Sequence, residues 1–395
     1  MQHDQQLKIL DDLLGLLDNQ TTARTDRARY NELSVYTDPE VLVREKQAFF
    51  RDWPLVAALS VDLPGPGAYV AQMLLDMPVL IVRGDDGIAR AFVNACRHRG
   101  ARVVESGCGV RKLFTCPFHA WGYAPDGRLA AIPHAESFEA PDPTTLGLIP
   151  LPLVERYGLI WVMLQPEGPA FDIDTYLGGL GPELASWRLD EGPRVGDTGI
   201  ETAINWKYAI DTFGETYHFE TLHRDTVSSA YHSNRQLYDI YGRNHRMVFV
   251  GRTIEELRDQ PRADWKVRSH ALFAYYLFPN TQLLVQRGGT SLFRIFPDPA
   301  APDRSVTRHT FYAEPDSTDA EGLAHARAVF EGTQRVIATE DYAMAEQAQA
   351  GLAAGALRYA VFGRNEPALH HYHRTYREAL GLPPLIDGLA VQPAE

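Results

Sequence analysis

The chain has 395 residues, of which 45% are hydrophobic and 23% charged, as in an ordinary globular protein with room for two or three domains. A formal net charge of −13 argues against nonspecific nucleic-acid binding, which needs a basic surface. Because we find no apolar run long enough to cross a bilayer, no signal-peptide pattern and only three cysteines, we expect a cytoplasmic protein without a membrane partner.

The first part of the chain changes from helical to extended patterning. Leucines on one helix face predict an amphipathic helix over residues 4–18. Asp38-Pro39-Glu40 predicts the start of a second helix, which extends to about Phe50. Residues 54–165 alternate short apolar runs with Gly, Pro and Asp turns, so we expect a small antiparallel β domain there.

Helical and extended patterns mix in the second part of the chain. Residues 200–226 and 318–353 predict helices, whereas residues 271–296 and 305–313 predict strands. The expected fold class is therefore α+β. The expected division is N-terminal helices at 1–44 that pack with the last domain, a β domain at 45–165, and a larger α+β domain at 166–395, an antiparallel sheet flanked by helices.

A first group of candidate metal ligands lies inside the β domain. Cys96-x-His98 and Cys116-x2-His119 offer two thiolates and two imidazoles. A structural zinc site is one interpretation, but zinc sites usually pair like ligands. Because each segment supplies one cysteine and one histidine, the pattern favours a two-iron cluster with both thiolates on one iron and both imidazoles on the other. Cys108, between the two segments, is expected to be a buried side chain without a partner.

A second group of candidate ligands lies between residues 205 and 223. Asp211, Glu215 and His218 would share one face of a helix, and His223 follows His218 by five positions. Imidazoles at that spacing reach one metal only if the helix ends or bulges between them. With 14 histidines in the chain, such a pair arises by chance fairly often, so histidines packed in a helix remain an alternative for this segment alone.

The two groups of candidate ligands, taken in their order along the chain, resemble those of the catalytic α subunit of Rieske non-haem iron oxygenases. These enzymes are also called aromatic-ring-hydroxylating oxygenases. The resemblance covers residues 40 to 355 approximately. It rests on the cluster motif followed by Trp121, Asn205-Trp206-Lys207, Glu215-Thr-Tyr-His-x4-His223 and Phe278-Pro279-Asn280. It implies a Rieske [2Fe-2S] cluster bound by Cys96, His98, Cys116 and His119.

The resemblance also implies a mononuclear Fe(II) site. His218 and His223 match the two histidine ligands of the family by motif position. The third ligand would be a carboxylate of the helix that contains Glu340 and Asp341, where Asp341 matches better and Glu340 is the alternative. Acidic residues at this place also favour a helix N-terminus for electrostatic reasons alone.

Other residues receive roles by the same resemblance. Glu215 would bridge an iron-bound histidine to a cluster histidine of the neighbouring subunit, at a position where many members have Asp. A Glu there resembles a subset that includes oxygenases acting on quaternary amines. Ala120 departs from the Gly that commonly follows the last cluster histidine. From the residues themselves, Asp211 is a candidate neighbour of the iron ligands. Phe213 and Phe219 are candidates for the substrate pocket because they are apolar and near the iron motif; packing in an ordinary hydrophobic core is the alternative.

The implied activity is that of a terminal oxygenase. Electrons from NAD(P)H would arrive through a ferredoxin or flavin reductase, since the chain has no dinucleotide or flavin fingerprint. With O2, an aromatic or related small organic substrate would be mono- or cis-dihydroxylated. Oxidative N- or O-demethylation, including of quaternary amines, is the alternative reaction. A homotrimer, with or without β subunits, is implied. A Rieske electron carrier or binding protein without a working iron site is the non-enzyme alternative.

Two further groups of residues allow more than one interpretation. Basic side chains around the cluster loops would either dock an acidic ferredoxin or be solvated loop charges: Arg97, Arg99, Arg102, Arg111 and Lys112. Three histidines near the C-terminus predict a satisfied surface cluster rather than another metal site: His370, His371 and His373.

Overall fold

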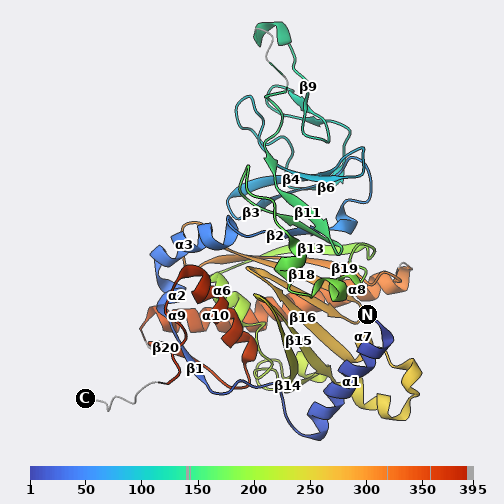
Figure 1. Ribbon diagram of the computed structural model, residues 1–395, viewed down its shortest axis with the longest axis vertical. Helices are drawn as coiled ribbons and strands as arrows, with labels where there is room; N and C mark the ends of the chain where they lie inside the picture. The colour runs from blue at the N-terminus through green and yellow to red at the C-terminus, as the bar shows by residue number, and fades with distance from the viewer. Residues whose placement is uncertain (139–141, 143, 318, 356, 389–395) are drawn as a thin grey trace. The chain divides into compact units, whose positions relative to one another are not determined.

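The computed structural model describes residues 1–138, 142, 144–317, 319–355 and 357–388, and the chain divides into two compact units (Figure 1). The larger unit comprises Met1–Ala48, Asp174–Trp187 and Gly192–Glu395, and the β unit comprises Phe49–Ile173 and Arg188–Glu191. Antiparallel sheets and helices together confirm the α+β class. Among the described residues, no helix is long and apolar enough to cross a membrane.

The β unit contains three small antiparallel sheets. Their strand orders are β10-β5-β4-β3-β6, β11-β12-β2 and β7-β8-β9. A common core of Phe114, Trp121 and Tyr123 packs with both cysteines of the cluster motif. The strands are β2 (Leu55–Leu59), β3 (Ala68–Leu74), β4 (Met77–Arg83), β5 (Ala89–Val93), β6 (Gly107–Val110), β7 (Phe114–Thr115), β8 (Gly122–Tyr123), β9 (Leu129–Ala131), β10 (Pro150–Leu151), β11 (Leu153–Arg156) and β12 (Leu159–Val162).

A seven-stranded antiparallel sheet forms the centre of the larger unit (Figure 1). Its order is β13-β19-β18-β17-β16-β15-β14, so each hairpin pairs neighbours in sequence except where β13 joins at the edge. The inner strands are buried on both faces, which explains their continuous apolar runs. The strands are β13 (Arg194–Thr202), β14 (Tyr231–Tyr241), β15 (Asn244–Gly251), β16 (Ala271–Leu277), β17 (Thr281–Gln286), β18 (Gly289–Pro297) and β19 (Ser305–Ala313).

Helices cover this sheet. A helix over 320–353 is confirmed but contains a π-helical turn, Ile337–Asp341. Its first part packs on β13 and β19 through Ala326 and Phe330. The helices are α1 (His3–Asp18), α2 (Ser34–Thr37), α3 (Pro39–Phe50), α4 (Ile173–Leu177), α5 (Gly181–Ala185), α6 (Trp206–Asp211), α7 (Val267–His270), α8 (Ala320–Val336), α9 (Tyr342–Ala353) and α10 (Pro367–Leu380), and β1 (Arg29–Glu32) pairs with β20 (Tyr359–Phe362).

The prediction of a helix over 200–226 is wrong for most of that range. The segment begins as the end of β13, forms only α6, and continues from residue 212 as turns. Gly214 explains the early end, because a Cβ there would lie 2.4 Å from Leu369 Cδ2 of α10. Because α6 ends at Asp211 and turns follow, Asp211, Glu215 and His218 do not share a helix face.

Candidate metal centres and substrate cavity

The cluster motifs form two similar loops in the β unit. Cys96 lies in the loop after β5, and Cys116 lies in the loop between β7 and β8. In each loop the amide four residues later donates to the cysteine carbonyl, from Gly100 at 2.8 Å and from Ala120 at 3.0 Å. Both residues have a positive φ, 77° and 58°. Ala120 therefore adopts a left-handed conformation that costs a residue with a Cβ about 1–2 kcal/mol.

The four side chains of the cluster motif fit a group with two metal ions. Cys96 and Cys116 are buried, whereas His119 is exposed. The rings of His98 and His119 have centroids 4.6 Å apart, and His98 Nδ1 is buried without a hydrogen-bond partner in the described structure. Two buried thiolates and two adjacent imidazoles are the ligand types of a Rieske [2Fe-2S] cluster.

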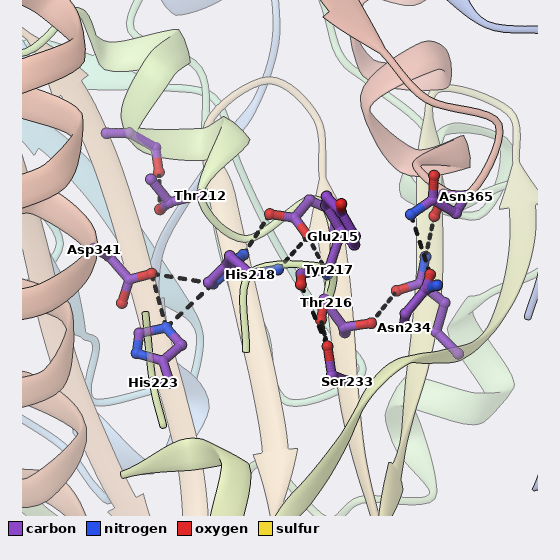
Figure 2. Close-up of polar contacts among 12 residues, drawn as sticks. Thr212, Glu215, Thr216, Tyr217, His218, His223, Ser233, Asn234, Asp341 and Asn365 are labelled. Atoms are coloured by element: carbon purple, nitrogen blue, oxygen red, sulfur yellow. Dashed lines mark hydrogen bonds and ion pairs between the residues drawn. The ribbon is translucent and has the colours of Figure 1, made fainter. Parts of the chain in front are cut away.

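Three side chains converge at a second site, in the larger unit (Figure 2). The Nε2 atoms of His218 and His223 are 3.1 Å apart. Asp341 Oδ1 lies 3.1 Å from His223 Nε2 and 3.5 Å from His218 Nε2. Two imidazoles and one carboxylate that face a common point are the donor set of a non-haem Fe(II) centre with open positions. The residues present therefore fit a mononuclear iron.

Glu215 holds the other side of the first histidine. Its carboxylate hydrogen-bonds His218 Nδ1, on the side away from Asp341 (Figure 2). The same carboxylate accepts from the backbone amides of Tyr217 and His218. Because a carboxylate only accepts, the imidazole proton lies on Nδ1 and Nε2 is left free to bind a metal. Glu215 thus contacts the predicted histidine directly, as its expected role requires.

Glu340 holds the second histidine in the same way. Its Oε2 lies 2.7 Å from His223 Nδ1 and accepts a hydrogen bond from Thr226 Oγ1 at 2.8 Å. The π-helical turn widens the helix at this point, so that Glu340 and its neighbour Asp341 both reach the same imidazole. Asp341 lies at the convergence point and Glu340 behind the ring, which separates the two carboxylates that the sequence left as alternatives.

The electrostatics of the convergence point favour a cation. Burial lowers the pKa of His218, but hydrogen bonds to Asp341 and Glu215 outweigh it and raise this pKa to about 9. Burial raises the pKa of Asp341, yet its hydrogen bonds to His218 and His223 bring it below the usual value. An ionised carboxylate that attracts protons onto two neighbouring imidazoles is a place where a divalent metal would replace those protons.

A cavity of about 430 Å³ adjoins the three converging residues. Phe213 and Phe219, the pocket candidates from the sequence, both line it. Phe219 also packs edge-on against the rings of His218 and His223, with centroid distances of 5.1 and 5.6 Å. The rest of the lining is mainly apolar, and includes Phe249, Leu272, Leu284, Val329, Val336 and Ile337.

A second cavity, of about 280 Å³, reaches the same ligands from another side. Its lining shares Glu215, His218 and Asp341 with the first cavity and adds Asp211 and Glu366. Burial raises the pKa of Glu366 to about 7, and the charge of Glu215 adds to this effect. The second cavity is therefore the more acidic of the two, while the first is the more apolar.

Asp211, expected beside the iron ligands, has its hydrogen-bond partners elsewhere. Tyr36 OH donates to its Oδ2 at 2.6 Å, and His373 Nε2 lies 2.8 Å from its Oδ1. In the described structure Asp211 makes no hydrogen bond to His218 or His223, and it faces His218 only across the second cavity. Its contacts join α6 to α2 and α10.

Two predictions about single side chains are wrong. The three histidines of α10, expected at the surface, are buried, because most side chains of this helix pack in the interior: His370, His371 and His373. They are satisfied as expected, through Gly363 O, Gly242 O and Asp211 respectively. Cys108, expected to be buried, is exposed on β6, whose residues are all exposed.

The sequence did not reveal the cavity wall that α8 provides. Residues 329, 332, 333 and 336 line the first cavity and recur with the spacing of one helix face. This periodicity was visible in the sequence, but nothing distinguished a face that lines a cavity from one that packs on a sheet. The role of Thr226 as a partner of Glu340 had no sequence signal.

Two family models match the chain in order. Residues 52–151 match the Rieske [2Fe-2S] domain, and residues 189–382 match the catalytic domain of the ring hydroxylating alpha subunit. The first match includes the four residues of the cluster motif. The second includes His218, His223 and Asp341.

Individual relatives are oxygenase subunits as well. The carnitine monooxygenase oxygenase subunit of Acinetobacter baumannii is 25% identical over 325 residues, 80% of this chain and 83% of that protein. The glycine betaine monooxygenase oxygenase subunit of Chromohalobacter salexigens is 33% identical over 196 residues, 49% of this chain and 43% of that protein. This second match therefore spans less than half the length of that relative.

Solved structures share the fold. A quaternary ammonium Rieske monooxygenase in complex with L-carnitine has a TM-score of 0.75 at 21% identity, and the match covers 90% of this chain and 96% of that one. Naphthalene 1,2-dioxygenase with indole bound has a TM-score of 0.72 at 20% identity, covering 90% of this chain and 93% of that one. At this identity the likeness concerns the fold alone.

Proposed function

Since the chain belongs to the catalytic alpha subunits of the Rieske oxygenases, we propose that two metal centres cooperate in it. It is the oxygenase component of a multicomponent system, an oxidoreductase that uses O2, a Rieske [2Fe-2S] cluster, a mononuclear iron and electrons delivered by a reductase. We assign the cluster to Cys96, His98, Cys116 and His119, and the iron to His218, His223 and Asp341.

The proposed reaction is hydroxylation of a small organic molecule held in the 430 Å³ cavity. The observation that carries it is that His218, His223 and Asp341 converge at the wall of a mainly apolar cavity. Substrate C–H, O2, two electrons and two protons would give the hydroxylated product and water. NAD(P)H would supply the electrons through a flavin reductase or ferredoxin. An aromatic substrate that takes up both oxygen atoms would give a cis-diol for the same two electrons and two protons.

The chain's own residues prepare this reaction. The iron, when bound, supplies the chemistry of O2 activation. Glu215 and Glu340 fix the tautomers of the two histidines, so that both Nε2 atoms face the metal position. Phe213 and Phe219 exclude bulk water and offer an apolar surface to the substrate. An apolar cavity also holds a C–H group close to the metal without a competing polar contact.

Electrons are proposed to arrive between subunits. His119, on the exposed side of the cluster loops, would face Glu215 of a neighbouring copy, and a closed ring of three copies satisfies every such contact. Exposed apolar side chains flank both places: Phe118 is 58% exposed near the cluster loops, and Tyr217 is 65% exposed beside Glu215. The exposed basic residues around the cluster loops, Arg97, Arg99, Arg102, Arg111 and Lys112, are proposed to dock the electron donor.

Oxidative demethylation of a quaternary amine is the second candidate reaction. Two relatives favour it, since they are named as carnitine and glycine betaine monooxygenase oxygenase subunits. Four rings that line the cavity could surround an ammonium group: Phe213, Phe219, Tyr231 and Phe249. Hydroxylation of an N-methyl group releases formaldehyde, whereas ring hydroxylation does not, so a formaldehyde assay separates the two candidates.

The metal assignment is tested on anaerobically purified protein. We expect about three irons and two acid-labile sulfides per chain, and a Rieske electron paramagnetic resonance signal after reduction. His218→Ala should lose one iron and all product formation and keep the cluster signal. Product formation by this variant would refute the iron assignment, and two irons in the wild type would leave an electron carrier.

The bridging role of Glu215 has its own test. Glu215→Gln keeps the size of the side chain but removes the charge that holds His218. We expect the single-turnover rate of electron transfer from the reduced cluster to fall much further than the iron content. An unchanged single-turnover rate would contradict the bridging role.

A further inference from the structure

The rim of the 430 Å³ cavity has an unusual charge for this protein. Glu215 and Asp341 in its lining are engaged with the histidines, which leaves Asp225, Arg287 and Arg335 as the other charged side chains. All three are exposed. Within the described ranges, neither guanidinium group has a hydrogen bond or an ion pair. In a chain of net charge −13, the mouth of the cavity thus has one net positive charge.

The positions of these two arginines are set by packed elements. Arg287 lies in the turn between β17 and β18, where the amide of the next residue, Gly288, donates to Glu314 Oε1 at 2.6 Å. A Cβ on Gly288 would lie 3.0 Å from Val329 of α8, so the turn packs closely on this helix. Arg335 lies in the last turn of the same helix. The backbone positions from which both arginines extend are therefore fixed by packing.

The interior of the cavity is mainly apolar. Its wall includes Phe249, Leu272 and Leu284, and its buried polar side chains other than the proposed metal ligands, such as Gln286, are uncharged. A substrate with an anionic group would have to keep that group at the rim, because burying an unpaired carboxylate among these side chains is costly. Its apolar end would then point toward His218 and Asp341. Charge-assisted hydrogen bonds from guanidinium to carboxylate are strong and directional.

We propose that the cavity takes an organic monocarboxylate, with its carboxylate bound by Arg287 and Arg335 and its apolar or methyl-bearing end at the metal ligands. This inference rests on the proposed function. Asp225, on the same rim, leaves a single net positive charge and thereby favours a monoanion over a dianion. The two arginines are specificity determinants: they select and orient the substrate, and they do not touch the reacting atoms.

The test compares each acid with its uncharged amide on the reduced, anaerobic holoenzyme by isothermal titration calorimetry. Three matched pairs vary the body of the ligand: benzoate and benzamide, cyclohexanecarboxylate and its amide, and glycine betaine and its amide. We expect at least one acid to bind about tenfold more tightly than its amide. Arg287→Gln and Arg335→Gln should each remove most of this preference and leave amide binding unchanged.

Arg327→Gln is the matched control, because Arg327 is exposed on α8 but does not line the cavity. It should keep the acid preference of the wild type. The proposal is wrong if no acid binds more tightly than its amide, or if the Arg327 variant loses the preference as fully as the other two. Failure of the iron assignment is recognised separately. In that case the wild-type protein would contain fewer than three irons per chain, whether or not it binds acids more tightly than their amides.

Discussion

At the residue scale, the two glutamates behind the histidines determine how well the site can hold a metal. Glu340 fixes His223 through a 2.7 Å contact and is itself held by Thr226. Outer contacts of this kind typically change metal affinity by 10–100-fold. The neighbouring Asp341 differs from Glu340, because its Oδ1 lies beside His223 Nε2, at the proposed metal position.

We predict that Glu340→Ala lowers the affinity for mononuclear iron by about 10–100-fold and leaves the cluster signal intact. Glu340→Gln should lose less, because its amide oxygen can still accept the proton of His223 Nδ1. Iron titration of the chelated protein measures both. Glu331→Gln, at an exposed position of α8 outside the cavity, is the control. Equal iron affinity in Glu340→Ala and the wild type would exclude this role.

Gly332 gives a second prediction at this scale. It lies in the interior of α8 and lines the cavity, and a Cβ there would meet no atom within 4 Å. The backbone does not need glycine at this point, since glycine costs a helix about 0.5–1 kcal/mol relative to alanine. We expect Gly332→Ala to stabilise the protein by about that amount, and Gly332→Leu to exclude larger ligands without loss of iron.

The matched control for Gly332 is Gly351→Ala in α9. A Cβ on Gly351 would also meet no atom within 4 Å, but this residue does not line the cavity. The control should give the same gain in the free energy of unfolding and no change in ligand size selection. Urea unfolding and ligand titration separate the two effects. Unchanged size selection in Gly332→Leu would show that the helix face does not limit the ligand.

Sequence reasoning reached His218, His223 and Asp341 at the residue scale through motif position. It could not separate the duties of Glu340 and Asp341, because an ideal helix turns adjacent residues about 100° apart and allows only one of them to face a given point. The π-helical turn removes that restriction. No residue pattern in Ile337–Asp341 indicates such a turn.

At the element scale, a buried ion pair joins α3, α6 and α10. Lys207 Nζ lies 2.5 Å from Glu45 Oε1, and both side chains are 0% exposed. Trp206 Nε1 donates to Glu45 Oε2 at 2.7 Å, and Tyr376 OH donates to the other oxygen. Burial lowers the pKa of Lys207 against the attraction of Glu45. The Asn205-Trp206-Lys207 segment thus fixes α6, after which the chain continues into the turns that contain His218 and His223.

We predict that Lys207→Met lowers the free energy of unfolding by about 3–5 kcal/mol, because it leaves Glu45 charged and buried without its partner. The double variant Lys207→Met with Glu45→Gln should be more stable than the single variant, since no buried charge remains. Denaturant unfolding with a double-mutant cycle measures this. A double variant less stable than Lys207→Met would show that the pair does not act as a unit.

The elements themselves were predictable where one periodicity dominates. Four strands of the large sheet, β16 to β19, correspond to the ranges predicted as strands, and the helix over 320–353 lies within a range predicted as helix; β13, β14 and β15 were not predicted. The helix expected over 200–226 does not form as predicted because tertiary contacts act there: α10 approaches Gly214 closely, and the Glu215 side chain hydrogen-bonds His218. The helix propensity of the segment does not indicate either of these two contacts.

At the scale of the whole molecule, buried histidines make stability depend on pH. His371 Nε2 donates to Gly242 O at 3.0 Å, so its Nδ1 must accept from His245 Nδ1 at 3.1 Å. Burial lowers the pKa of His371 to about 4 and that of His245 well below its usual value. Since these values lie below those of the unfolded chain, the unfolded state binds protons first as the pH falls.

The stability contributed by His371 is therefore complete above about pH 6.5 and lost as the pH falls toward 4, on the order of 3 kcal/mol in total. We expect the free energy of unfolding of the wild type to decrease over this window, and His371→Gln to show a smaller decrease. His134→Gln, at an exposed position, is the control and should follow the wild type. Parallel curves for all three proteins would contradict this account.

The order of the Rieske domain and the catalytic domain could be inferred from the sequence, because short motifs indicate both; the assignment of individual metal ligands stays a prediction. The 430 Å³ cavity could not, since its wall combines β14–β17, α8 and turns that are distant along the chain. The burial of His370, His371 and His373 was missed for the same reason: the face that α10 turns inward depends on the sheet and helices around it.

The shared lining of the two cavities has a consequence for traffic through the enzyme. Glu215, His218 and Asp341 form a partition with an apolar chamber in front and an acidic chamber behind. A substrate that fills the front chamber closes only that face of the partition. We therefore expect water and protons to reach the metal ligands through the rear chamber, which Asp211 and Glu366 line, while the substrate stays in place. Protons for each turnover would then arrive from the second cavity, while the product leaves through the first.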